Sequence, residues 1–175
     1  MVQAAAPLQT SLDDPGFESP AVGSGTFAAL VSEPTGTSWT YGRSAGVSGN
    51  GSGFTAGNPN APDGNQVAYI QQDGSLSQSA TLAGGDYTIT FLAAQRIQWQ
   101  YGGLQDFQVL VDGSLVGTFK PSAGGAYAAY QTSDFMVSVG AHTITFKGLD
   151  SAGGDNTAFI DAVRIDIPTL TNALS

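Results

Sequence analysis

Two Asp-Gly pairs, each flanked by runs in which apolar and polar residues alternate, constrain the fold of this chain more than any other feature. The pairs are Asp73-Gly74, between residues 66–72 and 75–82, and Asp112-Gly113, at the junction of residues 105–112 and 114–119. An Asp-Gly pair readily adopts the positive backbone angles of a tight primed turn, and such a turn connects two antiparallel strands. Both segments are therefore predicted to form β-hairpins.

Further alternating runs, separated by turn residues, follow along the chain. Between residues 86 and 96, for example, Tyr87, Ile89 and Phe91 share one face, and the intervening threonines share the other. Strands are predicted at residues 66–72, 75–82, 86–96, 105–112, 114–119, 130–137, 142–149 and 157–167. No long amphipathic helix is expected, and this spacing is typical of a β-sandwich or barrel.

The region before these strands is richer in turn residues. Phe17 and Trp39 are its expected first core residues. Residues 42–65 form a long tract of Gly, Ser, Asn and Pro, and loops of this length are uncommon unless they bind a ligand or are held by their own side chains. The tract is therefore predicted to be either a binding loop or a packed surface loop.

The composition limits the partners that such a protein can have. Its 175 residues carry a formal net charge of −9, with five basic side chains in all. This charge disfavours nucleic acid and anionic membranes, and among glycans it favours neutral ones. Because the chain has no cysteine, disulfides and thiolate metal sites are excluded. We expect one module over residues 13–167, between a disordered leader or linker (1–12) and a C-terminal linker (168–175).

A set of short motifs in a fixed order resembles a known family. The motifs are Gly16-Phe17-Glu18, Trp39, and residues 63–68, 75–78, 85–91, 94–96, 111–113, 140–146 and 153–161. Together they resemble bacterial galactose-binding-domain-like modules, which are similar to jelly-roll carbohydrate-binding modules and to the DUF642 domains of plant cell walls. The resemblance implies an all-β, antiparallel β-sandwich with jelly-roll topology. It also implies a secreted, extracellular protein in which the module is covalently linked to a catalytic or surface domain.

Residues 94–106 are the strongest candidate for a binding site. A sugar presents apolar C–H faces ringed by hydroxyls, so its receptor needs a flat aromatic surface with polar groups at the edge. Trp99 and Tyr101 would supply that surface. The polar contacts would come from Gln95, Arg96, Gln98 and Gln100. The alternative is structural: Trp99 would cap the end of the sandwich, and Arg96 would pair with Asp106.

A second aromatic cluster follows two glycines. Tyr127 and Tyr130 could extend the aromatic surface, although packing at a strand edge is the favoured interpretation. The two tyrosines are therefore secondary candidates for the carbohydrate site.

The resemblance also implies a structural calcium ion where the first and last strands meet. Glu18 matches the early Glu of the family and Asp161 its late Asp, so these two would be the side-chain ligands. Calcium prefers hard oxygen ligands, and buried carboxylates without a cation are costly. In the alternative interpretation, both carboxylates accept hydrogen bonds from loop amides.

The sequence provides little for catalysis. The lone histidine, His142, lies in an alternating strand, and no Gly-x-Ser-x-Gly nucleophile motif accompanies it. Phosphate-binding and dinucleotide-binding motifs are also missing. We therefore expect a non-catalytic carbohydrate-binding module that tethers a secreted enzyme or surface protein to a polysaccharide. The alternative is a structural or adhesive spacer that binds no glycan.

Overall fold

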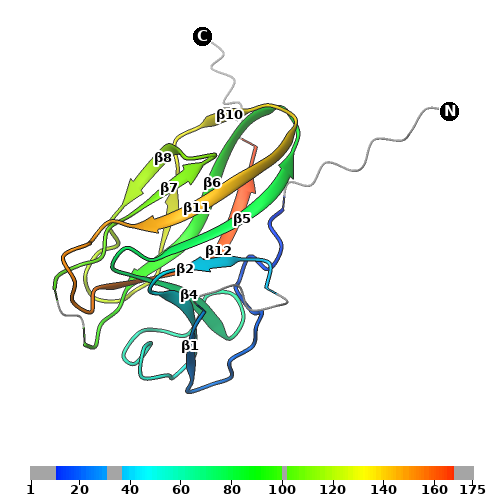
Figure 1. The fold of residues 1–175 in the computed structure, drawn as a ribbon. Helices are drawn as coiled ribbons and strands as arrows, with labels where there is room; N and C mark the ends of the chain where they lie inside the picture. Colours follow the sequence, from blue (N-terminus) through cyan, green and yellow to red (C-terminus); the bar gives the residue numbers. More distant parts are fainter. Residues whose placement is uncertain (1–10, 31–36, 100–101, 168–175) are drawn as a thin grey trace, which may run out of the picture.

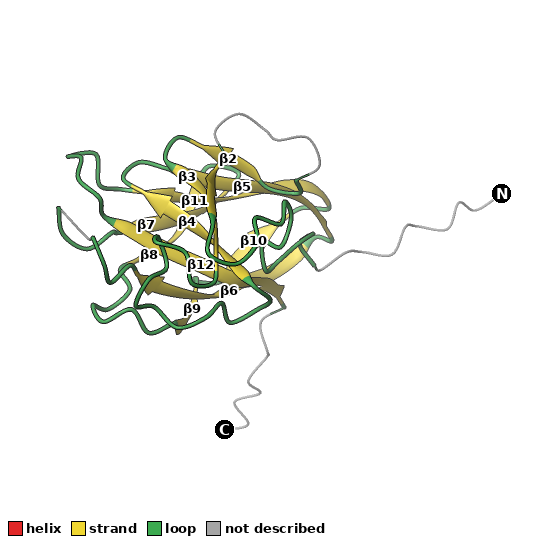
Figure 2. Ribbon diagram, turned by 90° about the horizontal axis from the view of Figure 1, so that it is seen from below, coloured by secondary structure: helices red, strands yellow, loops and turns green. Residues whose placement is uncertain are grey.

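Two antiparallel β-sheets packed face to face make up this protein (Figure 1). The computed structural model describes residues 11–30, 37–99 and 102–167. Throughout these ranges the chain forms strands, turns and loops without a helix, as Figure 2 shows. The described residues accordingly include no helix that is long and apolar enough to cross a membrane. The prediction of an all-β antiparallel sandwich is confirmed.

The strands divide unequally between the sheets. The larger sheet contains β1 (Phe27–Ala29), β3 (Ala45–Gly49), β4 (Gln66–Gln71), β12 (Thr157–Asp166), β6 (Gly85–Gln95) and β10 (Phe135–Val137) in this order, and β9 (Ala128–Gln131) pairs with β6. The smaller sheet contains β2 (Thr40–Gly42), β5 (Ser75–Leu82), β11 (Gly140–Gly148), β7 (Phe107–Val111) and β8 (Ser114–Phe119). Neighbouring strands are therefore mostly distant in sequence, which makes the topology difficult to predict from local patterns.

Alternation along each strand builds the core between the sheets. In β7, Phe107, Val109 and Val111 are buried, whereas the two residues between them are partly exposed. Phe17 and Trp39 are fully buried, with ring centroids 4.8 Å apart, as predicted. Burial of apolar surface of this kind contributes about 25 cal/mol per Å² to stability.

The first predicted hairpin is wrong, because β4 and β5 lie in different sheets. Residues 72–74 carry the chain across the sandwich. The positive φ lies at Gln72 (53°) and not at Asp73 or Gly74. Gly74 is required for a different reason: a Cβ at this position would lie 2.6 Å from the carbonyl oxygens of Arg43 and Ser44. This Asp-Gly pair therefore marks a crossing between sheets.

The second predicted hairpin is confirmed. Strands β7 and β8 are antiparallel neighbours, and Val111 pairs with Ser114 across the turn. Asp112 and Gly113 both have positive φ, 50° and 79°, as a primed two-residue turn requires. Here the turn predicted from the Asp-Gly pair and the observed pairing of the two strands agree.

The single strand predicted over residues 130–137 is interrupted. Thr132 bonds to Ile89 through both its backbone N–H and its side-chain hydroxyl, and the next N–H, of Ser133, donates to the Val116 carbonyl in the other sheet. The chain therefore leaves β9 and re-enters the larger sheet as β10.

The tract at residues 42–65 is partly strand and partly packed loop. It contains β3, which was not predicted, and its remainder crosses the outer face of the larger sheet. Phe54 packs there on Tyr69, with ring centroids 4.6 Å apart. Together with Val67 and Phe159 these rings form a second apolar cluster, separate from the main core. The loop is thus held by its own side chains.

Candidate functional site

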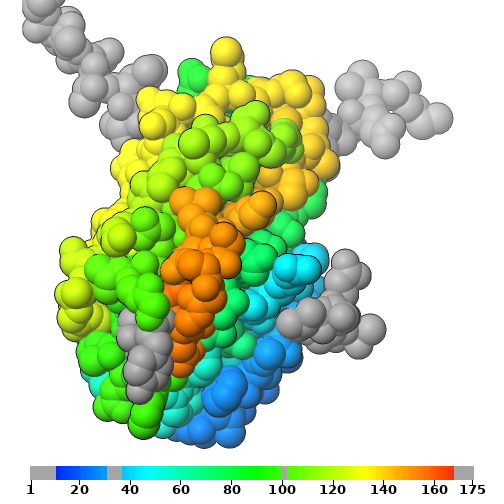
Figure 3. Space-filling view, turned by 60° about the vertical axis from the view of Figure 1, so that its left-hand side comes forward, coloured from blue at the N-terminus to red at the C-terminus, as the bar shows by residue number. Residues whose placement is uncertain are grey.

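Five connections meet at one end of the sandwich, which we call the loop end. They are the β2–β3 turn (43–44), the β4–β5 crossing (72–74), the β6–β7 loop (96–106), the β8–β9 loop (120–127) and the β11–β12 loop (149–156). Figure 3 shows the β6–β7 loop, in green, beside the β11–β12 loop, in orange. The opposite end, which we call the turn end, carries the short β5–β6, β7–β8 and β10–β11 turns. The predicted binding segment therefore lies at the end that carries the three long loops.

Trp99 stands in the β6–β7 loop with 59% of its surface exposed. Its φ of 62° is unusual for a bulky residue and points to a loop held in a defined conformation. Gln98 is exposed beside it. Tyr101, the other predicted aromatic residue, lies outside the described residues. The indole is thus available to a ligand, as an aromatic stacking surface must be.

Gln95 and Arg96 do not lie on the ligand side, contrary to the sequence-based expectation. Gln95 is 1% exposed, and Arg96 is 6% exposed. The Arg96 guanidinium lies 2.9 Å from Asp155 and stacks 4.0 Å from the centre of the Phe54 ring. Arg96 therefore pairs with Asp155 and not with Asp106. The polar groups of both side chains are therefore buried within the protein, where they stabilise the β6–β7 loop and do not face a ligand.

Tyr127 and Tyr130 are used in packing. Tyr130 stacks on Phe91, with centroids 5.8 Å apart and planes 19° apart. Tyr127 packs against the apolar cluster on the outer face, and its hydroxyl is buried. Burial, reinforced by the charge of Asp161, raises the pKa of Tyr127. This arrangement corresponds to the packing interpretation rather than to an extended aromatic surface.

Asn58 joins the long loop on the outer face to the loop end. Its side-chain amide donates to the carbonyl oxygens of Gln95 (2.8 Å) and Gly125 (3.0 Å). Its carbonyl oxygen accepts from the N–H of Ile97 (3.1 Å). One side chain thus satisfies backbone groups of two different loops. The position of the segment that carries Trp99 is thereby tied to the rest of the sandwich.

A hollow of about 390 Å³ opens at the loop end. It is lined by Gly102, Gly103, Leu104, Asp106, Lys120, Leu149 and Asp150. The ammonium of Lys120 lies 2.9 Å from the Asp106 carboxylate. Two leucines can contact C–H groups, while the carboxylates accept and the ammonium donates hydrogen bonds. This lining suits a small molecule that presents both apolar C–H groups and many hydroxyls.

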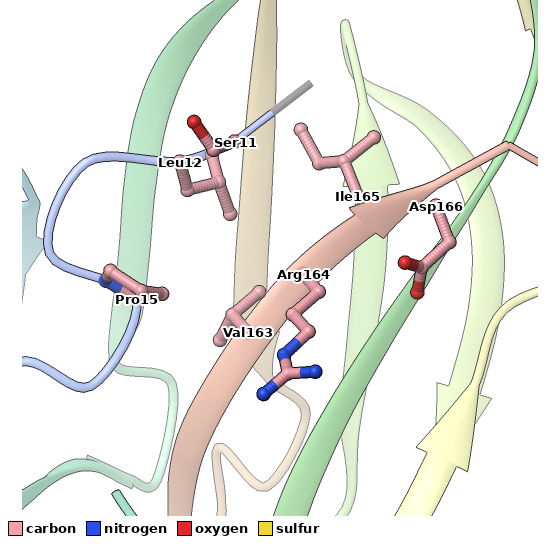
Figure 4. A pocket seen from close by; sticks show the side chains of 7 residues that line it. All are labelled: Ser11, Leu12, Pro15, Val163, Arg164, Ile165 and Asp166. Atoms are coloured by element: carbon pink, nitrogen blue, oxygen red, sulfur yellow. The ribbon is translucent and has the colours of Figure 1, made fainter. Parts of the chain in front are cut away.

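A second hollow, shown in Figure 4, has different chemistry. It measures about 320 Å³ and lies between residues 11–15 and the end of β12. Its lining is mostly aliphatic, and Arg164 and Asp166 are its charged members. Neither lining includes an aromatic residue, but the hollow at the loop end is lined in part by the loop that also carries the exposed Trp99, which makes it the better candidate for a sugar.

Glu18 and Asp161, the predicted calcium ligands, both accept hydrogen bonds from the C-terminal part of the β3–β4 loop (residues 50–65) and the start of β4. Asp161 in β12 is fully buried and accepts from the N–H of Asp63 (2.9 Å). Glu18 accepts from the N–H groups of Asn65 (2.8 Å) and Gln66 (3.0 Å). Each carboxylate thus accepts hydrogen bonds from loop amides, as the alternative to calcium requires.

The electrostatics of this pair would favour a cation. Burial raises the pKa of Asp161 to about 7, and the charges of Asp63 and Glu18 act in the same direction. Carboxylate oxygens are ligands that calcium prefers, so the donor chemistry fits. In the part of the chain that is described, however, no group of three or more acidic or histidine side chains is arranged to hold a metal. A bound cation would therefore depend on Glu18, Asp161 and backbone carbonyls.

The predicted segment 94–106 supplies Gly102, Gly103, Leu104 and Asp106 of the hollow, whereas Lys120, Leu149 and Asp150 were not predicted. Asp106, Lys120 and Asp150 come from three different connections, and no spacing in the sequence links them. Their proximity arises only from the pairing of β7 with both β8 and β11.

Comparison with known proteins identifies the fold but not the family. No family model and no curated protein matches the sequence. Among solved structures, TmCBM61 in complex with β-1,4-galactotriose is 17% identical, with a TM-score of 0.59 over 91% of this chain and 99% of that chain. The chain has the β-sandwich fold of carbohydrate-binding modules.

The same fold also occurs in enzymes. The Stig cyclase Fisc from Fischerella sp. TAU, solved with an indole-containing ligand, is 17% identical, with a TM-score of 0.62 over 91% of this chain and 99% of that chain. One sandwich thus serves a sugar-binding protein and a cyclase. Function must therefore be inferred from the site and not from the fold.

Proposed function

We propose that this chain is a non-catalytic carbohydrate-binding module that holds a neutral glycan at its loop end. The observation that carries the proposal is the exposed indole of Trp99, in the same loop as Gly102, Gly103 and Leu104 of the hollow. An indole stacks well on the C–H face of a sugar ring. Sugar hydroxyls would then bond to the charged groups of the hollow.

The charges support a neutral ligand. The hollow contains two carboxylates and one ammonium, and the whole chain carries a formal charge of −9. An anionic polymer would be repelled at long range. The binding of β-1,4-galactotriose, an uncharged sugar, by a protein of the same fold supports this choice.

Such a module would act by proximity. Attachment to a polysaccharide raises the effective concentration of a covalently linked catalytic or surface domain without altering its chemistry. A secreted, extracellular protein is the natural setting, because insoluble polysaccharides occur there. The covalently linked domain and the extracellular location are both parts of this proposal.

Calorimetry across a panel of neutral oligosaccharides tests the proposal. Wild-type protein should bind at least one of them, and Trp99→Ala should weaken that binding by about tenfold or more, equivalent to about 1.4 kcal/mol. Leu115→Ala is the matched control, because Leu115 is 60% exposed but lies at the turn end. Unchanged affinity in Trp99→Ala would remove the site, and the absence of binding to every sugar would favour the spacer alternative.

The likeness to Fisc makes an enzyme the second candidate. A non-catalytic role is supported by the position of His142, which is engaged at the turn end by Asp112 (2.7 Å) and by the Ser138 carbonyl (2.8 Å). Incubation with polysaccharides and with small indole substrates, followed by product analysis, distinguishes the two. Product formed at catalytic protein concentrations would establish an enzyme.

A structural calcium ion at Glu18 and Asp161 is a separate part of the proposal. It rests on the raised pKa of the buried Asp161 carboxyl beside two further acids. A bound cation would neutralise this group and join the N-terminal segment to β12. Calcium at 100 times its Kd would add about 2.7 kcal/mol to the free energy of unfolding. Melting curves with calcium or a chelator should differ for wild type and coincide for Asp161→Asn. Coinciding wild-type curves would exclude the ion.

A further inference from the structure

We propose that Gln105, a buried residue outside the hollow, is a positioning residue that fixes the shape of the glycan site. The proposal rests on the proposed function for the identity of the ligand. It rests on the structure alone for the mechanical role of the side chain. Gln105 is 0% exposed and lies at the end of the β6–β7 loop, directly before Asp106 of the hollow.

Each polar group of Gln105 has a partner. Its backbone N–H and C=O bond reciprocally with the side-chain amide of Gln95, at 3.0 and 2.7 Å. Its own side chain donates to the Gln72 carbonyl (2.6 Å) and accepts from the Asn156 side-chain amide (2.9 Å). Gln105 therefore joins the β4–β5 crossing, both ends of the β6–β7 loop and the β11–β12 loop.

The network continues into the hollow through Asn156. This residue is also fully buried, and its NH₂ group donates both to Gln105 and to the carboxylate of Asp150. The other oxygen of Asp150 accepts from the N–H of Ala152 (2.9 Å). The orientation of Asp150, which lines the hollow, thus depends on an amide that Gln105 holds in place.

The backbone leaves room for this amide at one specific point. Gly148 ends β11, and a Cβ there would lie 2.0 Å from the Gln72 carbonyl oxygen and 2.5 Å from the Gln105 side-chain nitrogen. Any larger residue would displace the group that Gln105 bonds. The packing of Gly148 and the hydrogen bond between Gln72 and Gln105 therefore depend on each other.

An amide is the functional group that this position requires. It offers a donor toward the Gln72 carbonyl and an acceptor toward Asn156 at the same time. All these bonds are made, and the Asn156 side-chain carbonyl oxygen is the one buried atom of the network without a partner. Buried hydrogen bonds of this kind rigidify the segments that they join. We infer that Gln105 determines glycan affinity without touching the glycan.

Gln105→Met removes the amide and keeps the approximate length of the side chain. Glycan affinity should fall by about tenfold. Amides of residues 96–99 and 149–156 should exchange hydrogen faster, while amides of β6 and β12 keep their protection. The matched control is Gln108→Met in β7, because Gln108 lies on the face of that strand opposite the buried residues. Wild-type affinity and wild-type loop protection in Gln105→Met would overturn the inference.

Gln105→Glu provides a test by rescue. A protonated Glu offers one donor and one acceptor, as the amide does, whereas the ionised form directs a second acceptor at the Gln72 carbonyl. The affinity of this variant relative to wild type should therefore be near unity at about pH 5 and fall by about tenfold at about pH 8. A constant ratio would contradict the positioning role, because a merely packed side chain would not depend on its proton.

The two measurements separate this inference from the proposed function. If wild type binds no glycan, the function fails, and hydrogen exchange of the loops in Gln105→Met still decides whether Gln105 fixes them. If wild type binds and the Gln105 variants bind equally well, the function stands and the positioning role fails.

Discussion

The two ends of the sandwich are held together by different chemistry. At the loop end, neutral amides of Gln95, Gln105 and Asn156 connect the long loops beneath the surface. At the turn end, the imidazole of His142 connects the β7–β8 and β10–β11 turns. Neutral amides keep their hydrogen bonds at any moderate pH, whereas an imidazole does not. The difference indicates that the shape of the proposed binding site is independent of pH, while the stability of the opposite end is not.

The geometry of His142 favours its protonated form. Its two ring nitrogens lie 2.7 Å from an Asp112 carboxylate oxygen and 2.8 Å from the Ser138 carbonyl oxygen. Both partners only accept hydrogen bonds, so both contacts are satisfied when both nitrogens donate, as in an imidazolium. The hydrogen bond that His142 donates to Asp112, followed by the one that it donates to the Ser138 carbonyl, raises the pKa of His142. The same bond to His142 lowers the pKa of Asp112.

Gly148→Ala should give the largest change. A Cβ would lie 2.0 Å from the Gln72 carbonyl, so the backbone of the loop end must move, at a cost of about 3 kcal/mol. Gly113→Ala at the turn end is the matched control, because its Cβ would meet nothing within 4 Å and only its φ of 79° is strained, at about 1–2 kcal/mol. Urea denaturation measures the free energy of unfolding of both variants. Equal losses of this free energy would show that the two ends tolerate an added Cβ equally well.

Asn58→Ala should have the next largest effect. It leaves the carbonyls of Gln95 and Gly125 and the N–H of Ile97 without their side-chain partner, which should cost about 2 kcal/mol. The exposed Asn60 in the same loop is the control, and its replacement by alanine should stay within about 0.5 kcal/mol. A loss in Asn58→Ala no larger than this would mean that water replaces the bonds of Asn58.

His142→Gln should give the smallest change and the clearest pH dependence. Because the folded-state pKa of His142 is raised, its contribution is complete below the unfolded pKa of about 6.5 and disappears as pH rises through the folded value. The variant should therefore lose up to about 1 kcal/mol at about pH 5 and close to nothing at about pH 9. The loss in Gln105→Met should be the same at both pH values. A pH-independent loss in His142→Gln would contradict the imidazolium.

The sequence indicated the strands better than their partners. The alternation in residues 75–82 and 114–119 predicted β5 and β8 with their observed bounds. The two Asp-Gly pairs, however, behave differently: one forms a hairpin and the other a crossing between sheets. Turn chemistry is local, but whether two strands pair is decided by the assembly of the whole sandwich. Such information is not present in a run of ten residues.

The site was predictable only in part. Trp99 stood out as an aromatic residue in a polar loop, and it is exposed. Gln95 was assigned to the ligand side, although its position continues the inward face of Tyr87, Ile89 and Phe91 in β6; strict alternation would have indicated its burial. Arg96 follows the strand, so alternation does not determine its orientation. The charged groups of the hollow come from separate loops and could not be assembled from the sequence.

The most direct test is an NMR titration of the two tryptophan indoles with a neutral oligosaccharide. The indole N–H of Trp39 is buried and donates to the Asp14 carbonyl (2.9 Å), so it is an internal control. The exposed indole of Trp99 should shift on addition of the glycan and saturate with it, while that of Trp39 remains in place. If a glycan binds and the Trp99 signal does not move, or if no neutral glycan moves it, the loop end is not a carbohydrate site.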